Sequence, residues 1–259
     1  MDQRARQQPS AVGQQLRAWR ARRHLPQLEL SIRANVAARH LSFVETGRSQ
    51  PGRDFILRIA DELDIPLRER NALLMLAGFS PMLEATLFSD AAFDSIRGIV
   101  DLTLERHKPF PAYLVDRHWN VIRSNGAVPE LYEGVDATLM SEPNVIRLVL
   151  HPKGLAPRLQ NYAVSRNHYV NLLRHQFDMT ADPQLGALLR ETLAYPSVNA
   201  AADMTVDGPA VPLIVRTRLG TLSFIGATTV FRSPADVTLQ EIALEVMHPA
   251  DTFTENVIR

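Results

Sequence analysis

The sequence contains no cysteine among its 259 residues. This absence excludes disulfides, thiolate metal sites, iron–sulfur ligation and a cysteine nucleophile. No apolar run approaches the ~20 residues that a membrane-spanning helix needs. The N-terminal segment, MDQRARQQPS, also lacks the apolar core of a secretory signal. We therefore expect a cytoplasmic protein with no membrane partner.

The common motifs of nucleotide-binding and hydrolytic enzymes are missing as well: the sequence has no GxGxxG, GxxxxGK[ST] or GxSxG. The acidic pair Asp61 and Glu62 falls on a helix face that we expect to be solvated. His168 and His175 are seven residues apart, but no third ligand accompanies them at a suitable spacing. We expect no catalytic residues, no metal site and no required cofactor.

Charge is unevenly distributed, although the chain as a whole is neutral. Residues 1–53 contain ten arginines and three acidic residues, a net charge of +7, so residues 54–259 carry −7. A basic segment is suited to binding a polyanion, whereas a weakly acidic segment is suited to binding a different kind of partner. The distribution predicts two modules with different partners.

The first 78 residues have the apolar spacing of short, closely connected helices. Ser10 is available as the N-cap of the first, and Asn35 suits a left-handed turn between the second and third. Leu30 and Ile32 are expected on the inner face of the second, and Gly47 follows the third. The five helices are expected over 12–23, 27–34, 37–46, 54–63 and 67–77.

After about residue 107 the pattern changes from helical to alternating. Short runs rich in apolar and β-branched residues are typical of strands, and two pairs of such runs predict two hairpins. The pairs are 112–116 with 121–125, and 212–219 with 221–231 about Gly220. Residues 241–247 fit a last strand, although their pattern is equally compatible with a helix. Helices are expected over 90–107 and 126–194, and a loop over 196–209.

Residues 27–48 have the geometry that reading DNA requires. Two short helices meet at a tight turn, and Leu41 and Val44 would anchor the second to the core. A major groove about 12 Å wide admits one such helix, whose N-terminal residues reach the base edges. The residues expected to project outward are Ala38, Arg39, Ser42 and Phe43.

The stretch LRAWRARRHLPQLELSIRANVAARHLSFVETGRSQP resembles the helix-turn-helix of the XRE, or phage-repressor-like, family. The pattern is a Gln that opens helix 2, a turn residue, an Ile/Leu-Ser-x-x-Glu helix 3, then Gly-Arg and Pro. Its positions here are Gln27, Asn35, Leu41, Ser42, Glu45, Gly47, Arg48 and Pro51. The departures are Pro26 for Ser, Ser31 for Ala, and His24 and Asn35 for Gly. A left-handed His24 would cost ~1 kcal/mol.

The resemblance implies roles for individual residues. Arg39 would pair with a guanine, and Phe43 or Ala38 would touch a thymine methyl. Arg20 would neutralise Glu45 near the DNA phosphates. The base-facing set is Gln27, Ala38, Arg39 and Phe43, and the phosphate-facing set is His40, Ser42, Thr46 and Arg48. Plainer interpretations remain open, with Phe43 in the core, Arg39 solvated and His40 an ordinary surface residue.

The rest of the chain resembles the C-terminal part of MmyB-like regulators, in which an XRE domain precedes a PAS-like ligand-binding domain. The matching segments are PAYLVDRHWNVIRSNGAVPELY, NVIRLVLHPKGLAPRLQNY, VPLIVRTRLGTLSF and SPADVTLQEIALEVMHPAD. The resemblance implies an α+β protein: five helices, then a curved antiparallel sheet with helices on one face that close over a cavity. The expected parts are a DNA-binding domain (1–80), a connecting segment (81–107) and a ligand-binding domain (108–259).

Four residues are candidates for binding a ligand in that cavity. Trp119 and Asn125 lie in and just after the first hairpin, and Phe224 lies in the second. Arg147 interrupts the apolar run NVIRLVLHP and would pair with a carboxylate at the head of an apolar molecule. These residues suggest a fatty-acid-like or other small amphipathic ligand. Alternatively, Trp119 and Phe224 belong to the core and Arg147 to the surface.

We therefore expect a sequence-specific transcriptional regulator that binds double-stranded DNA as a homodimer, on half-sites one helical turn apart. A small-molecule effector in the second domain would shift the dimer between geometries. Two alternatives remain open. The second domain serves only dimerisation or protein interaction, or it is an enzyme, which would need a cleft with convergent groups of perturbed pKa.

Overall fold

A computed structural model describes residues 10–196, 210–231 and 236–259. The chain divides into two compact units, one built chiefly from residues up to Ala85 and the other from Thr86 onward. No helix in these described ranges is both long and apolar enough to cross a membrane. The loop expected over 196–209 lies, except for Pro196, outside the described residues.

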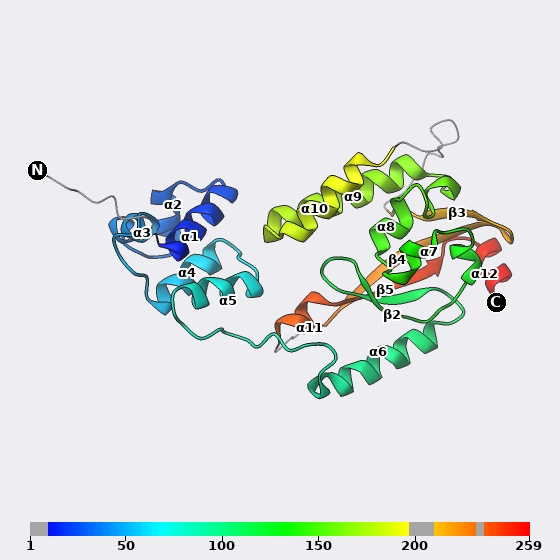
Figure 1. The fold of residues 1–259 in the computed structure, drawn as a ribbon, viewed down its shortest axis with the longest axis horizontal. Helices are drawn as coiled ribbons and strands as arrows, with labels where there is room; N and C mark the ends of the chain where they lie inside the picture. The colour runs from blue at the N-terminus through cyan, green and yellow to red at the C-terminus, as the bar shows by residue number, and fades with distance from the viewer. Residues whose placement is uncertain (1–9, 197–209, 232–235) are drawn as a thin grey trace, which may run out of the picture. The chain divides into compact units, whose positions relative to one another are not determined.

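The N-terminal unit consists of the five expected helices (Figure 1). The Ser10 side chain caps the first by accepting a hydrogen bond from the Gly13 amide at 3.2 Å. Leu16, Leu30 and Leu41 from the first three helices are fully buried together in the core. The helices are α1 (Ala11–Arg22), α2 (Gln27–Arg33), α3 (Ala38–Glu45), α4 (Arg53–Glu62) and α5 (Leu67–Leu76).

The two turns around α2 are left-handed, as the sequence predicted. His24 has φ 53° and Asn35 has φ 50°. The expectation that Ile32 faces inward was wrong, because its side chain is 71% exposed while that of Leu30 is fully buried. Two residues along a helix turn the side chain by roughly 200°, so Leu30 and Ile32 cannot share an inner face.

Helices α1 and α3 approach each other closely at Gly13. A Cβ atom at this position would lie 2.1 Å from the Val44 carbonyl oxygen. Real carbon and oxygen atoms do not come that near, so a side chain here would force the backbones apart. The close approach fixes α3, the expected DNA-binding helix, against the rest of the unit.

The C-terminal unit is built on a five-stranded antiparallel sheet of strand order β2-β1-β5-β4-β3. Both predicted hairpins are present, and the segment that fitted either a strand or a helix is a strand, β5. The α+β class and the PAS-like sheet are confirmed. The strands are β1 (Ala112–Val115), β2 (Val121–Ser124), β3 (Leu213–Thr217), β4 (Gly220–Val230) and β5 (Ala243–Pro249).

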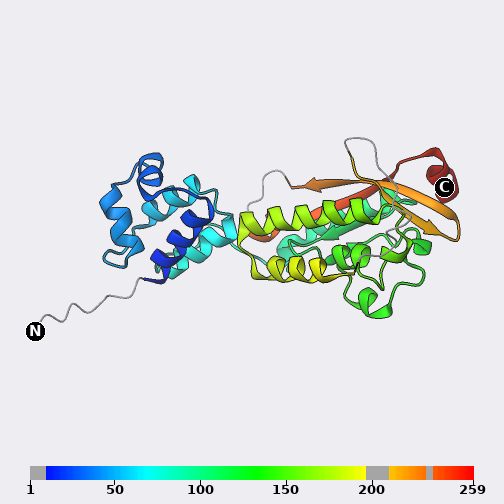
Figure 2. The ribbon, with the colours of Figure 1, turned by 90° about the horizontal axis from the view of Figure 1, so that it is seen from above.

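Helices flank this sheet on both faces, which corrects the expectation of helices on one face only (Figures 1 and 2). On one face Val100 and Leu104 of α6 (Asp94–His107) pack against Leu114 and Leu244, so this helix is part of the domain rather than only a connection. The other face is covered mainly by α8 (Val145–Leu150), α9 (Tyr162–Thr180) and α10 (Pro183–Ala194). Shorter elements are η1 (Ala91–Phe93), η2 (Pro129–Tyr132), α7 (Ala137–Ser141), η3 (Ala156–Arg158), α11 (Val237–Glu241) and α12 (Thr252–Ile258).

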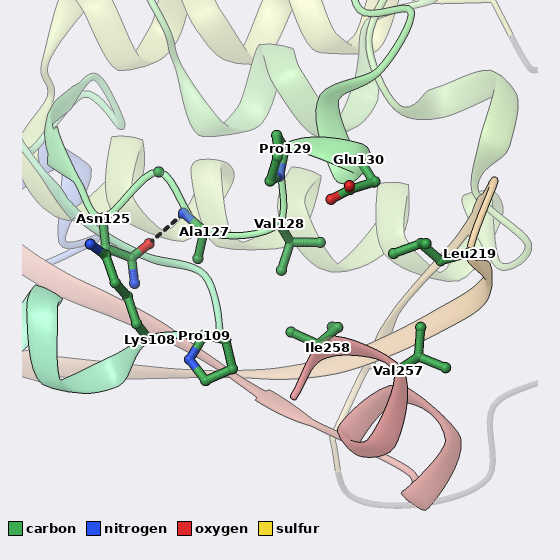
Figure 3. Close-up of a pocket in the computed structure, with 11 residues that line it drawn as sticks. Lys108, Pro109, Asn125, Ala127, Val128, Pro129, Glu130, Leu219, Val257 and Ile258 are labelled. Atoms are coloured by element: carbon green, nitrogen blue, oxygen red, sulfur yellow. Dashed lines mark hydrogen bonds between the residues drawn. The ribbon is translucent and has the colours of Figure 1, made fainter.

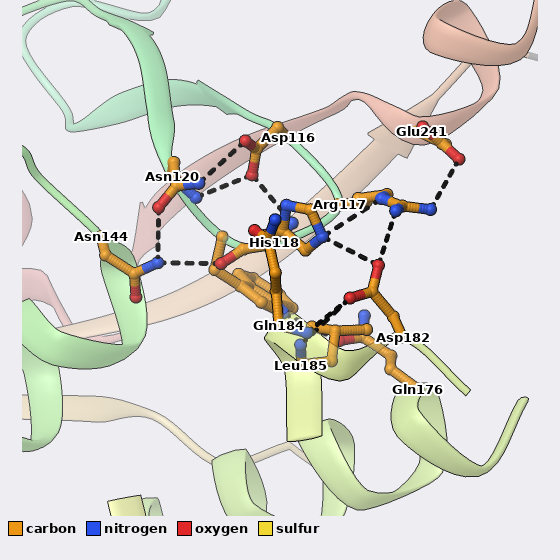
Figure 4. Close-up of polar contacts among 11 residues, drawn as sticks. Asp116, Arg117, His118, Asn120, Asn144, Gln176, Asp182, Gln184, Leu185 and Glu241 are labelled. Carbon is orange, nitrogen blue, oxygen red and sulfur yellow. Dashed lines mark hydrogen bonds and ion pairs between the residues drawn. The ribbon is translucent and has the colours of Figure 1, made fainter. Parts of the chain in front are cut away.

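The turn between β1 and β2 is tied to α10 by a polar cluster (Figure 4). Asp182 caps α10 by accepting from the Gln184 amide at 2.7 Å, and its carboxylate lies 2.9 Å from His118 Nε2. Arg117 pairs with the same carboxylate at 2.7 Å. Burial alone would raise the pKa of Asp182, but these hydrogen bonds and the arginine hold it below its usual value. The cluster fixes the turn that carries Trp119.

Candidate nucleic-acid interface and ligand cavities

The outer side of α3 presents an aromatic ring between two arginines. Arg39 and Arg48 are exposed, and Phe43 is partly buried. The guanidinium carbons of Arg39 and Arg48 lie 5.2 Å and 5.9 Å from the centre of the Phe43 ring. Such stacking orients a guanidinium without consuming its hydrogen-bond donors. Both arginines therefore keep donors available for bases or phosphates.

A buried carboxylate lies behind this surface. Glu45 is 3% exposed, and it accepts hydrogen bonds from Arg20 Nε at 2.7 Å and Arg20 Nη2 at 2.9 Å. Gln27 Nε2 donates to the same carboxylate at 3.0 Å. The expected pairing of Arg20 with Glu45 is present. It removes an uncompensated negative charge from beneath the proposed DNA-binding surface.

The remaining candidates are only partly accessible. Gln27, Ala38, His40 and Ser42 are half-buried, and the His40 ring packs edge-on against Phe55 with centres 4.8 Å apart. Thr46 is exposed, but its hydroxyl donates to the Ser42 carbonyl at 2.7 Å. His40 is therefore neither a fully solvated surface residue nor freely exposed for phosphate, because its ring packs against Phe55.

Three hollows in the described part of the C-terminal unit bear on ligand binding. The first, here the α12 cavity, has a volume of about 540 Å³ and lies between Lys108, Glu130 and the α12 residues Val257 and Ile258 (Figure 3). Glu130 is paired with Arg218 at 3.2 Å. This cavity is open at the surface rather than enclosed by the sheet and its helices.

The other two hollows meet at Tyr113 in β1. The apolar cavity, of about 450 Å³, is lined by Tyr113, Val121, Tyr132, Met140 and Leu148 among others. The polar cavity, of about 360 Å³, is lined by Tyr113, Trp119, Ser165, Tyr169 and Glu245 among others. A small hollow of about 20 Å³ shares lining residues with both, Tyr113 among them. Tyr113 is therefore a wall common to one mainly apolar and one more polar cavity.

Two of the four expected ligand residues line these cavities. Trp119 lines the polar cavity, and its indole Nε1 donates to Gln176 Oε1 at 2.8 Å. Asn125 lines the apolar and α12 cavities, but its side chain is occupied by the backbone. It accepts from the amides of Ala112 and Ala127 and donates to the carbonyls of Leu104 and Phe110. Asn125 is therefore a structural residue at a cavity wall.

The other two expected ligand residues serve the structure. Arg147 makes a bidentate pair with Glu191 of α10, at 2.9 Å from Nε and 2.8 Å from Nη2. These bonds hold the pKa of Glu191 below its usual value. Phe224 has 0% exposure and belongs to the core. Arg147 is paired within the chain, which corrects the expectation that it receives a ligand carboxylate, and Phe224 is a core residue, as its alternative interpretation had it.

The polar residues that line the polar cavity were not among the candidates that the sequence pattern indicated: Tyr113, Ser165, Tyr169, Thr228 and Glu245. The sequence does contain a signal for one of these residues, Glu245. Glu245 is a single acidic residue in an otherwise apolar run, ALEV. If that run is a strand, period-two alternation places Glu245 and Met247 together on one face.

Comparison with known families agrees with this architecture. The profile of the MmyB-like transcription regulator ligand binding domain matches residues 96–259, and that of a helix-turn-helix domain matches residues 11–73. Neither description names an enzyme. No curated protein matches the chain.

One solved structure, the "Structure of an RNA-binding Light-Oxygen-Voltage Receptor", is 12% identical with a TM-score of 0.27. The match covers 96% of this chain and 60% of that one, and a likeness this weak carries no argument. The ligand-binding-domain profile alone spans well over half of the residues. The chain belongs to the MmyB-like transcription regulators, DNA-binding proteins in which a helix-turn-helix domain is joined to a ligand-binding domain.

Proposed function

We propose that α3 enters the major groove and recognises a specific operator sequence, with two copies of the chain on half-sites one helical turn apart. The exposed guanidinium of Arg39, in the first turn of α3 and stacked near Phe43, is the observation that carries this proposal. An oriented arginine pairs in bidentate fashion with guanine O6 and N7. Arg48 follows the helix and contacts phosphate instead.

The experiment compares two arginine variants on operator and random duplexes. Arg39→Ala costs about 1–3 kcal/mol on the operator and relaxes discrimination at one base pair. Arg48→Ala weakens all sequences alike and reduces the slope of log affinity against log salt by about one. Equal losses on operator and random duplex for Arg39→Ala would contradict the role given to Arg39.

We also propose that the second unit binds a small amphipathic molecule, for which a fatty-acid-like compound is one candidate. The apolar and polar cavities, which share Tyr113 as a lining residue, support this, since both volumes fall within the range of about 300–1,000 Å³ common for ligand sites. Native mass spectrometry of the protein after incubation with extracted lipids tests it. Retention of a stoichiometric small molecule is expected, and no retention would contradict it.

Ligand binding would then shift the dimer between geometries that do and do not match the spacing of the half-sites. Saturating ligand should change operator affinity or the preferred spacing, and unchanged values would contradict this coupling. A domain used only for dimerisation or protein contact needs no cavity. The apolar and polar cavities therefore favour the ligand-controlled version.

A further inference from the structure

A row of polar side chains crosses the sheet beneath its helices. In register, Ser124 of β2 lies opposite Tyr113 of β1, Tyr113 opposite Glu245 of β5, and Glu245 opposite Thr228 of β4. Directly opposed residues of antiparallel strands project to the same face. Tyr113 and Met247 pack in the core on the α9 side, so the row points into the cavities rather than toward α6.

The opposite wall of the polar cavity is also polar. Helix α9 supplies Ser165, His168 and Tyr169. Ser165 is 1% exposed, and its hydroxyl oxygen is buried without a hydrogen-bond partner among the described residues. An unsatisfied buried hydroxyl is costly, so such a group is expected to meet a polar partner from outside the chain.

Glu245 sets the charge preference of this space. Thr228 Oγ1 donates to Glu245 Oε1 at 2.8 Å, and no arginine or lysine occurs among the described residues that line the cavity. Burial raises the pKa of Glu245, and burial together with the neighbouring tyrosines and Glu245 raises the pKa values of Tyr113 and Tyr169. A second negative charge is unfavourable here, whereas a donor group is favourable.

We propose that the polar cavity binds a hydrogen-bond-donating head, an ammonium or a hydroxyl group, of an amphipathic ligand whose apolar chain lies in the apolar cavity beyond Tyr113. The inference deepens the proposed small-molecule function and rests on it. In place of a ligand carboxylate bound by Arg147, it assigns a hydrogen-bond donor of the ligand bound by Glu245. Ser165 and Glu245 accept hydrogen bonds from opposite walls, and Tyr113, which lines both cavities, marks where head and chain divide.

The test uses three probes that share one chain: octylamine, octan-1-ol and octanoate, titrated into the full-length protein by calorimetry. Octylamine should bind at least about tenfold more tightly than octanoate, because hydrogen bonds to a charged group are the stronger ones. Glu245→Gln should weaken octylamine by about tenfold and leave octan-1-ol nearly unchanged. Octanoate binding as tightly as octylamine would overturn the proposal.

A glycine offers a way to block the site without disturbing its polar groups. Gly226 of β4 lines the polar cavity, and a Cβ built on it meets nothing within 4 Å. Gly226→Leu should abolish binding of octylamine and octan-1-ol. Gly98→Leu, at an equally open glycine of α6, is the matched control and should bind as the unaltered protein does.

These outcomes distinguish failure of the head-group assignment from failure of the proposed small-molecule function. Full octylamine affinity in Gly226→Leu would place the site elsewhere and overturn the inference. A preference for octanoate would overturn the head-group assignment while the proposed small-molecule function stands. Failure of all three probes to bind would contradict both.

Discussion

Replacing Arg20 by leucine tests whether the buried Glu45 carboxylate depends on its arginine partner. Among the described residues, Arg20 gives two hydrogen bonds to the carboxylate and Gln27 gives a third. With Arg20 removed, a charge that is 3% exposed keeps one neutral donor. Breaking a buried pair in this way costs about 3–5 kcal/mol. We expect about 3 kcal/mol, because Gln27 remains.

Urea unfolding measures this loss through the fluorescence of Trp19, which lies in α1, in a Trp119→Phe background that leaves one tryptophan. Arg33→Ala is the matched control, since its pair with Glu29 is about half exposed on both sides, 51% and 44%. Such exposed pairs contribute about 0.3–0.5 kcal/mol. A cost below about 1 kcal/mol for Arg20→Leu, close to that of the control, would refute the reasoning about the buried charge.

Three further changes test the packing and the polar contacts. Gly13→Ala should destabilise the N-terminal unit by about 1–3 kcal/mol, because the new methyl meets the Val44 carbonyl, whereas Gly98→Ala should stabilise its helix by about 0.5–1 kcal/mol. Asn125→Ala should lower the thermal midpoint of the C-terminal unit, since four backbone groups lose a partner. The lowered pKa of Asp182 contributes stability that is present above the unfolded pKa of about 4 and lost as the pH falls through the folded pKa. Asp182→Asn should remove that part of the acid dependence.

Each expectation has an outcome that contradicts it. Equal stability changes in Gly13→Ala and Gly98→Ala would show that α1 and α3 adjust freely. An unchanged midpoint in Asn125→Ala would show that its four bonds are redundant. The same acid profile in Asp182→Asn as in the unaltered protein would remove Asp182 from the account of acid sensitivity. Thermal unfolding of Asp182→Asn and of the unaltered protein between pH 3 and pH 7 measures this acid profile directly.

The N-terminal unit was largely predictable because its signals are local. Helix periodicity, the Ser10 cap and the left-handed positions of His24 and Asn35 all act within a few residues of chain. The hairpins followed from alternation about short turns, as at Gly220. Even the pairing of Arg20 with Glu45 was predictable, from the resemblance to the XRE family rather than from the spacing of the two residues.

The cavity residues were not predictable in the same way, because their roles depend on partners distant in sequence. The sequence around Arg147 indicates a ligand-binding group, because its actual partner, Glu191, lies 44 residues away. Glu245 reaches the cavity only because β5 lies between β1 and β4, and its segment also fitted a helix. Strand pairing, rather than composition, decides which face such a residue occupies.

Selection of bound duplexes from a random-sequence pool by the purified full-length protein shows directly whether α3 recognises a DNA sequence. The account predicts enrichment of a short, nearly palindromic site with half-sites about 10 bp apart. It also predicts that Arg39→Ala loses preference at one position of each half-site. Retention of all duplexes in proportion to their abundance would contradict a sequence-reading role for α3.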